Sequence, residues 1–386
     1  MLKKIQIINF KSHKDTTLDL SNLNVLTGIN GTGKSSTIQI LLALRQSHIQ
    51  RKLEDGLSLN KPLCEIGLGE EALYQYADNE GISINIEADV LGEPSWVFSA
   101  DNDNLKSDFL PISVSVGANS NLNATGLFNN NFQYLSAERW SARDAYPKGT
   151  QEVETNKQLS LERGQGELTA HFLDFFGTKI EVEDSLLHPN ELSNNQLIAQ
   201  TNAWLKEISY GVNAIISPSG TGYEIRYQFE VGGGNLPTKP FRSRNVGFGI
   251  PYTLPIITAI LSAKRGSLII IENPEAHIHP YGQAKLMYLI TLAAQNGVQF
   301  IIETHSDHII NSLAVACKSF EMGEKGINRE KAKIYYFDKN ESTHATEVHE
   351  IPILENGRLG AKPKGFFDQM AIDLRFLMKT NSRRNG

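Results

Sequence analysis

Cysteine is scarce in this sequence, with two residues, Cys64 and Cys317, among 386. They lie far apart and form no C-x-x-C pair, which excludes a disulfide-built scaffold and a zinc site made of cysteines. An excess of basic charge is missing as well, because 37 Lys and Arg stand against 43 Asp and Glu, for a net charge of −6. The chain as a whole therefore lacks the excess of basic charge typical of nucleic-acid-binding proteins, and any contact with DNA or RNA would need a local basic patch.

Long uninterrupted hydrophobic runs are lacking too. The most apolar stretch, residues 246–263, is broken by glycines and prolines and indicates buried core rather than a membrane span. The opening residues MLKKIQIINF alternate as a strand and show no secretory leader pattern. These features, with the low cysteine content, lead us to expect a cytoplasmic protein without membrane contact.

A glycine-rich loop stands out among the features that are present. Residues 23–27 predict a strand and residues 37–44 have helical apolar spacing. Between them lies the segment Gly28-Ile29-Asn30-Gly31-Thr32-Gly33-Lys34-Ser35-Ser36. It meets every fixed position of G-x-x-x-x-G-K-[ST] in the strand, loop and helix context that this phosphate-binding motif requires. Its backbone N–H groups would surround a phosphate, Lys34 would bridge phosphate oxygens and the Ser35 hydroxyl would bind Mg²⁺, which predicts a site for ATP and Mg²⁺.

Two further apolar segments predict buried strands that end on polar residues. Residues 267–271 lead to Glu272, and residues 300–302 lead shortly to His305. Ligand sites in open α/β sheets lie at the carboxyl ends of strands, so Glu272 is the candidate carboxylate for organising the metal. His305 is the candidate for contacting a γ-phosphate or holding an attacking water.

Several histidines near these strand ends suggest zinc as an alternative ion: His277, His279, His305 and His308. His277 and His279 could chelate together, but the sequence identifies no third ligand and no nearby cysteine. We expect these imidazoles to orient the turn after Glu272 or to line a dimer surface.

Apolar strands alternate with helical segments in the carboxyl half, which predicts a parallel sheet buried on both faces. Elsewhere the pattern is less regular. Residues 101–131 contain eight asparagines and predict a turn-rich insertion, residues 150–210 have helical character, and residues 211–230 predict two strands.

Taken together, these motifs resemble the ABC-type ATPase heads of the SMC, RecF and OLD (overcoming lysogenisation defect) group. The resemblance implies an α/β P-loop NTPase fold of ABC-ATPase type, with a mixed or parallel sheet core, an antiparallel β lobe and a helical insertion. Residues 245–249, before a predicted helix, and the ending with residues 356–358 and 365–369 also resemble a bacterial subfamily that has a short C-terminal domain of unknown function. The segments that carry these likenesses are residues 5–12, 26–35, 245–249, 271–280, 303–306, 356–358 and 365–369.

The resemblance implies a division of the chain into an ATPase domain, residues 1–330, and a small C-terminal domain, residues 331–386, that closes on the ATPase core. Within the ATPase domain we expect an N-lobe over 1–150, a helical insertion over about 150–210 and a C-lobe over about 211–330.

In such heads ATP is held between the P-loop of one protomer and a signature helix of another. The resemblance assigns the second contact to Ser243, Asn245, Gly247 and Gly249. Close helix packing that needs glycine is the alternative explanation. The resemblance further suggests Gln133 as a lobe-connecting glutamine that joins the metal site, while Arg139 and Arg143 either bind phosphate or form surface salt bridges.

One position departs from the pattern of the group. Related segments commonly place the general base directly after the metal-binding acid, and here that residue is Asn273, an amide that cannot accept a proton. Glu275 is the substitute candidate. The expected catalytic set is therefore Glu272, Asn273, Glu275 and His305, with intact ATP binding and slow hydrolysis.

These expectations favour an ATP-gated switch, a homodimer or higher homo-oligomer that scaffolds or regulates a separate nuclease or toxin in bacterial anti-phage defence. No carboxylate-rich nuclease motif is evident after residue 330, which is why the effector is expected on another polypeptide. A RecF-like or SMC-like DNA repair ATPase is the alternative, with basic segments at 45–52, 239–244 and 379–384. A small-molecule kinase would use the same P-loop without needing His305 or Gly247.

Overall fold

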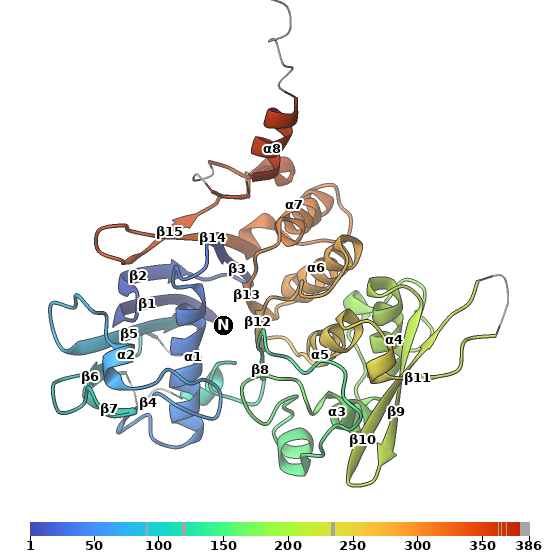
Figure 1. Ribbon diagram of the computed structural model, residues 1–386, viewed down its shortest axis with the longest axis horizontal. Helices are drawn as coiled ribbons and strands as arrows, with labels where there is room; N and C mark the ends of the chain where they lie inside the picture. The colour runs from blue at the N-terminus through green and yellow to red at the C-terminus, as the bar shows by residue number, and fades with distance from the viewer. Residues whose placement is uncertain are drawn as a thin grey trace, which may run out of the picture.

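The fold is built on two β-sheets with a buried helix between them (Figure 1). The computed structural model describes residues 1–89, 92–117, 121–232, 236–361, 363, 365–367 and 369–378. Within these residues each of the two sheets has six strands, in the orders β2-β1-β5-β6-β7-β4 and β15-β14-β3-β13-β12-β8. The helix between them, α1 (Lys34–Ile49), is buried along most of its length, and its apolar side chains share one hydrophobic cluster with residues of both sheets.

The first sheet is an antiparallel lobe. Its strands are β1 (Leu2–Phe10), β2 (His13–Asp19), β4 (Gly56–Ser58), β5 (Gly81–Ala88), β6 (Ser95–Ser99) and β7 (Phe109–Val116). Burial alternates along β5 and β6, as expected for a sheet with one face on the core. The segment expected as a turn-rich insertion therefore contributes a strand, because β7 pairs with both β6 and β4. Asn119 of that segment lies outside the described residues.

The second sheet carries the phosphate loop. Its strands are β3 (Leu23–Gly28), β8 (Phe132–Leu135), β12 (Leu268–Glu272), β13 (Gln299–Glu303), β14 (Ala332–Lys339) and β15 (Thr346–Glu350). All its pairings are parallel except that of the edge strand β15 with β14. Its central strands are buried along most of their length, which confirms the parallel α/β core predicted from the apolar runs.

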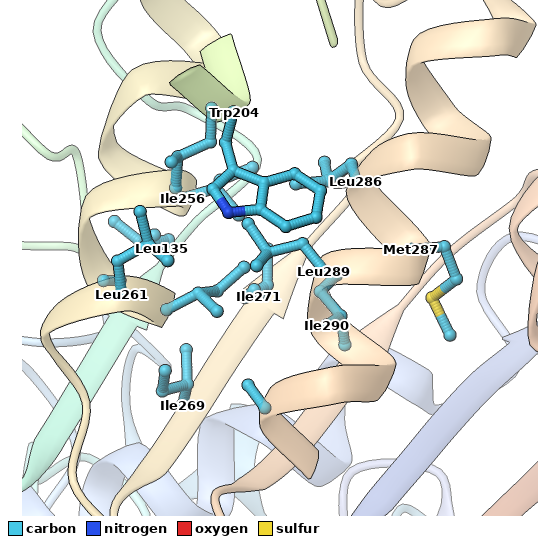
Figure 2. Packing of buried hydrophobic residues seen from close by; sticks show 14 of the residues in the cluster. Leu135, Trp204, Ile256, Leu261, Ile269, Ile271, Leu286, Met287, Leu289 and Ile290 are labelled. Atoms are coloured by element: carbon cyan, nitrogen blue, oxygen red, sulfur yellow. The ribbon is translucent and has the colours of Figure 1, made fainter. Parts of the chain in front are cut away.

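Helices cover the other face of this sheet (Figure 1). They are α3 (Thr169–Phe176), α4 (Leu197–Ile208), α5 (Gly249–Ser262), α6 (Pro280–Gln295) and α7 (Asp307–Glu321). Figure 2 shows Trp204 of α4 among side chains of α5 and α6 above β12. Burying a side chain of this kind contributes roughly 1.5–3 kcal/mol, so the packing fixes α5 and α6 firmly against the strand that ends at Glu272.

The region expected as a helical insertion is only partly helical. Between residues 150 and 210 the structure has α3, α4 and short turns, joined by irregular segments. The two strands expected after it are confirmed as the antiparallel pair β9 (Val212–Ser219) and β10 (Gly222–Phe229), with the short β11 (Phe241–Arg242) beside β10. Residues 233–235 lie outside the described residues.

The segment after residue 330 begins inside the core sheet. β14 pairs in parallel with the phosphate-loop strand β3, with Phe337 opposite Gly28, and β15 pairs back onto β14. The final described helix, α8 (Gln369–Leu377), extends away from α7 in Figure 1. No helix in the described part of the chain is long and apolar enough to cross a membrane.

Candidate functional site

The candidate site lies where β3, β13 and β12 end. Glu303 ends β13, which lies between β3 and β12, and Glu272 ends β12 directly beside it in register. The phosphate loop leaves β3 at Gly28, and α1 begins at Lys34. The fold thus brings the loop, both acids and the start of a helix to one edge of the sheet.

The two outer glycines of the loop have backbone conformations and neighbours that other residues would not tolerate. Gly28 has φ +137° and a Cβ there would lie 2.2 Å from the carbonyl oxygen of Phe337. Gly33 has φ +103° and a Cβ there would lie 2.3 Å from Thr346 Oγ1. Glycine at these positions lets the loop turn tightly while other segments pack against its outer side.

Lys34 lies folded over the loop. Its side chain is buried, and Nζ donates to the carbonyl oxygens of Gly28 at 3.0 Å and Ile29 at 2.7 Å. Burial lowers the pKa of Lys34, and the nearby Glu303 carboxylate opposes that shift. The ammonium group is therefore held at the loop, where phosphate oxygens would be its partners.

The closest carboxylate to the Ser35 hydroxyl is Glu303, a residue that the sequence analysis did not select. Ser35 Oγ lies 3.0 Å from Glu303 Oε1 and 2.9 Å from Oε2, and donates its one proton to this carboxylate. Burial and the charge of neighbouring Glu272 raise the pKa of Glu303 to about 7. The available signal was its place at the end of the apolar strand that precedes His305.

The Glu272 carboxylate makes its hydrogen bonds on the β8 side of β12, whereas the Glu303 carboxylate faces Ser35 of α1. Glu272 Oε1 accepts a hydrogen bond from Tyr134 at 3.0 Å, and Glu272 Oε2 accepts one from the backbone N–H of Ala137 at 3.1 Å. Burial raises the pKa of Glu272, although these hydrogen bonds and Arg139 oppose the shift. Glu272 is therefore a second, partly buried acid at the site, one strand farther from the loop than Glu303.

The turn after Glu272 brings Glu275 next to His305. Asn273 has φ +44°, a left-handed conformation that asparagine adopts more readily than most residues, and its N–H donates to the Glu303 carbonyl at 2.8 Å. Glu275 Oε1 accepts the backbone N–H of His305 at 2.8 Å. Asn273 Oδ1 and Glu275 Oε2 are buried and have no hydrogen-bond partner among the described residues. Such atoms are typical of a site that a ligand or water completes.

The His305 imidazole lies at the tip of β13, near the loop. Partial burial and the charge of Lys34 lower its pKa, with Glu275 and the backbone of Gly28 acting in the opposite direction. A neutral imidazole at pH 7 can donate one hydrogen bond and accept another, as contact with phosphate or water requires.

The chemistry of the donors fits Mg²⁺. A serine hydroxyl and carboxylates are hard oxygen ligands of the kind that this ion prefers. No group of three or more His, Cys, Asp or Glu side chains in the described residues has the arrangement of a metal site, so the zinc alternative gains no support. His279 instead caps α6 through the backbone N–H of Tyr281, and the ring of His277 contacts that of Tyr252 with centroids 5.0 Å apart.

The structure does not bring Gln133 to the metal site, contrary to the expectation. Gln133 lies within β8 opposite Ile269, three residues before the strand end at Glu272. Its Nε2 donates to the Lys157 carbonyl at 2.6 Å and its Oε1 accepts the Leu159 N–H at 3.2 Å. Both ends of the amide are therefore occupied in anchoring a neighbouring segment.

The four residues expected to contact a γ-phosphate across a dimer have different environments. Ser243 is buried, with Oγ 3.2 Å from the Tyr146 hydroxyl, and does not face solvent. Gly249 packs closely, since a Cβ would lie 2.3 Å from the carbonyl oxygen of His277, as the packing alternative predicts. Asn245 and Gly247 are exposed. This leaves Asn245 and Gly247 accessible to another molecule.

Arg139 neither faces a phosphate nor forms a surface salt bridge. It is buried, and Nη1 donates to the carbonyl oxygen of Glu272 at 2.7 Å while Nη2 donates to that of Asn273 at 2.8 Å. Nη1 also donates to the carbonyl of Ser136. Arg143 is exposed and lies over the Trp140 ring at 5.2 Å.

A phosphate loop, strand-end acids and a histidine on this parallel sheet define a P-loop ATPase of the ABC and SMC-head type. A family model described as "AAA domain, putative AbiEii toxin, Type IV TA system" matches residues 23–311, and the chain belongs to this family. A second model, described as a protein of unknown function (DUF3696), matches residues 327–377. A comparison with curated proteins found no match.

Solved SMC heads are similar in structure. An SMC head bound to the C-winged helix domain of ScpA has a TM-score of 0.52 at 12% identity, covering 91% of this chain and 98% of that chain. An SMC head domain from Thermotoga maritima has a TM-score of 0.46 at 10% identity and the same coverage, 91% and 98%. An SMC head with an extended coiled coil, bound to the C-terminal domain of ScpA derived from Pyrococcus furiosus, has 0.45 at 11%, covering 98% and 99%. At these identities the first match shows the shared fold.

Proposed function

We propose that this chain is an ATP-gated switch that binds Mg²⁺ and ATP and hydrolyses ATP slowly. The observation that supports it best is the grouping of Lys34, Ser35 and Glu303 at the loop with Glu275 and His305 beside them. The loop N–H groups, the α1 N-terminus and Lys34 supply the positive potential that phosphates require.

Ser35, Glu303 and Glu272 are the residues that would hold Mg²⁺. The bound ion would neutralise charge on the phosphate oxygens. The Ser35 hydroxyl donates to Glu303, which keeps the serine oriented toward the acid that would share the ion with it.

Glu275 is the group proposed to accept a proton from the attacking water. One of its oxygens is fixed by the His305 N–H, and the other is buried without a partner among the described residues. Neutral His305 would orient the water or a phosphate oxygen. Because Asn273 occupies the usual place of the base, the proton acceptor is two residues farther along the turn, and we expect slow turnover.

An open groove next to the loop suits the nucleoside part of ATP. It has a volume of about 680 Å³, and Ser12 is among its lining residues. Ser12 also contacts Thr346, the residue that packs against Gly33 of the loop. Tyr74, Tyr76, Lys339 and His344 also line the groove. Aromatic rings and polar groups in one groove can stack on a base and bind its edges.

We further propose that ATP closes a homodimer in which Asn245 and Gly247 of one protomer approach the loop of the other. Phe248 between Gly247 and α5 is 63% exposed, which provides apolar surface for such a contact. A separate nuclease or toxin would respond to this closure. We place this switch in bacterial anti-phage defence as part of the proposal; the family description, which names a putative AbiEii toxin and a type IV toxin–antitoxin system, supports the toxin part of it.

The basic segments expected for the alternative, a DNA repair ATPase, are only partly engaged within the chain: Arg51, Lys52, Lys239 and Arg242 are exposed, whereas one arginine of each described segment has partners. Arg45 of one expected basic segment is buried against Phe132 and donates to backbone carbonyls, and Arg244 of another is paired with Asp144 at 2.9 Å. The third segment, residues 379–384, lies outside the described residues.

Titration of the chain with ATP, with and without Mg²⁺, tests the proposed activity. The expected result is saturable binding that Mg²⁺ strengthens and that Lys34→Ala weakens by at least about 10-fold, since the loop loses its only side-chain cation. Phosphate release measured on the same protein should be slow and should fall further in Glu275→Gln. Equal ATP binding by wild type and Lys34→Ala would refute the assignment of the site.

A further inference from the structure

A residue from near the end of the chain contacts the outer side of the phosphate loop. Thr346, the first residue of β15, is buried, and its hydroxyl donates to the Thr32 carbonyl at 2.9 Å. The same hydroxyl lies 2.8 Å from Ser12 Oγ, and the Thr346 backbone N–H donates to the Ser12 carbonyl at 2.7 Å. One hydroxyl can donate one hydrogen bond and accept another, so these contacts form together.

The Thr346 contact sets the direction of a loop N–H group. The Thr32 carbonyl and the Gly33 N–H belong to one planar trans peptide, in which the two groups point in opposite directions. Holding the carbonyl outward on Thr346 therefore points the Gly33 N–H toward the inner side of the loop. An N–H group that is already oriented costs less entropy when a phosphate binds to it.

The next peptide is held in the same way by a different part of the chain. His13 Nε2 lies 3.1 Å from the Gly33 carbonyl, so the Lys34 N–H is directed inward as well. His13 belongs to β2, in the N-terminal sheet, whereas Thr346 belongs to the segment after residue 330. Within the described residues, Thr346 is thus the hydroxyl through which the C-terminal segment bonds to the loop backbone.

The fixed glycines of the motif show how closely the C-terminal segment packs against the phosphate loop. Gly28 leaves room for the backbone of Phe337 in β14, and Gly33 leaves room for Thr346 in β15. The turn between these strands is attached as well, because the Tyr74 hydroxyl donates to the Thr343 carbonyl at 2.7 Å. All three C-terminal residues lie within the segment 327–377 that the second family model matches.

We propose that Thr346 is a positioning residue for the phosphate loop, and that through it the β14–β15 hairpin takes part in nucleotide binding. The inference rests on the proposed function, since the loop must bind ATP or ADP for the contact to matter. Linkage is reciprocal: a hairpin that favours the nucleotide-bound loop is itself stabilised when nucleotide binds. The C-terminal segment then reports nucleotide occupancy to whatever contacts it.

Three variants separate positioning from packing. Thr346→Val keeps the side-chain shape and removes the hydroxyl, Thr346→Ser keeps the hydroxyl, and Glu341→Gln changes an exposed side chain on the same hairpin. Calorimetric titration with ADP and with ATP and Mg²⁺ should show about 10-fold weaker binding by Thr346→Val, equivalent to the loss of one hydrogen bond. Thr346→Ser should stay within about 2-fold of wild type, and Glu341→Gln should bind as wild type does.

Amide hydrogen exchange supplies a readout that packing alone would not change. ADP should slow exchange in β15 of the wild-type chain and of Thr346→Ser, and this response should be lost in Thr346→Val even at saturating ADP. The unfolding midpoint of each variant shows whether it is folded. The wild-type comparison needs no variant: if β15 exchange is unchanged when ADP saturates the loop, the proposal is wrong.

The remaining outcomes are also decisive. Wild-type affinity in a folded Thr346→Val chain would show that Thr346 only fills space and would overturn the inference while leaving the ATP site intact. A wild-type chain that binds neither ADP nor ATP would refute the proposed function itself, and the inference with it.

Discussion

Glu303 is the residue on which we expect the proposed magnesium site to depend most. It is 6% exposed, its carboxylate accepts a hydrogen bond from the Ser35 hydroxyl, and its charge acts on nearby Lys34. Glu272 is already engaged by Tyr134 and Ala137. The two acids therefore have unequal roles, with Glu303 closer to the ion that Ser35 would bind.

Glu303→Gln is expected to weaken ATP binding in the presence of Mg²⁺ by about 10-fold, because an amide is a poorer magnesium ligand than a carboxylate. Binding measured in EDTA should change by less than about 2-fold, since Lys34 and the loop amides remain. Glu272→Gln is the matched control and should have the smaller effect. If Glu272→Gln abolishes the magnesium effect and Glu303→Gln does not, the assignment is reversed.

The buried imidazole of His13 leads us to expect that the stability of the fold depends on pH. Burial lowers the pKa of His13 to about 4 from an ordinary 6.5. Between these values the unfolded chain binds more protons than the folded one, so stability that is present above pH 6.5 is lost as the pH falls toward 4. The expected loss is roughly 3 kcal/mol at full extent. Urea unfolding at several pH values should show it in wild type and show much less of it in His13→Gln. Parallel curves for the two chains would contradict this role for His13.

Arg139 connects separate elements. Its guanidinium joins the end of β8 to the turn after β12, and it lies 5.3 Å from the ring of Tyr252 in α5. Burial lowers the pKa of Arg139 to about 10, so the group stays charged at neutral pH. The turn that carries Asn273 and Glu275 and the helix that follows Gly247 are thereby attached to one side chain.

Arg139→Met should lower the free energy of unfolding by about 3 kcal/mol, because several buried carbonyls lose their donor at once. Arg139→Lys keeps the charge but not the planar fork and should recover only part of that loss. Arg143→Ala, at an exposed position nearby, is the control and should stay within about 0.5 kcal/mol. If the denaturation curve of Arg139→Met overlays that of the wild type, the Arg139 hydrogen bonds make no net contribution to the free energy of unfolding.

The elements around the loop could be predicted from local patterns, whereas their neighbours could not. The apolar runs before Gly28, Glu272 and Glu303 each form the strand that the sequence indicated. Strand order depends on pairing between distant segments, so the sequence could not show that β13 lies between β3 and β12. For that reason Glu272 was selected and Glu303 was missed.

The same limit explains two other differences. Gln133 was expected at the metal, but the register of β8 on β12 places it three residues before the strand end. The strand β7 was hidden in an asparagine-rich segment, because its pairing with β4 and β6, rather than local propensity, defines it.

At the scale of the whole molecule, the nucleotide site is assembled from both ends of the chain. The N-terminal sheet supplies Ser12 and His13, the core sheet supplies the loop and the acids, and the C-terminal hairpin supplies Thr346. The boundary expected at residue 330 falls just before β14, which is a strand of the core sheet.

Removing the chain from residue 331 onward is therefore expected to unfold the core rather than release a domain, which loss of the cooperative thermal transition would reveal. A truncated chain that still binds ATP would contradict this.

We propose that ATP, and not ADP, closes two copies of the chain. The most direct measurement is sedimentation velocity of Glu275→Gln, which should retain ATP unhydrolysed, in Mg²⁺ with ATP, with ADP and without nucleotide, beside Lys34→Ala as the control. We expect twice the chain mass with ATP alone, and we expect no nucleotide to change the mass of Lys34→Ala. A Glu275→Gln chain that has the same mass in all three conditions, while titration shows that ATP is bound, would contradict the switch.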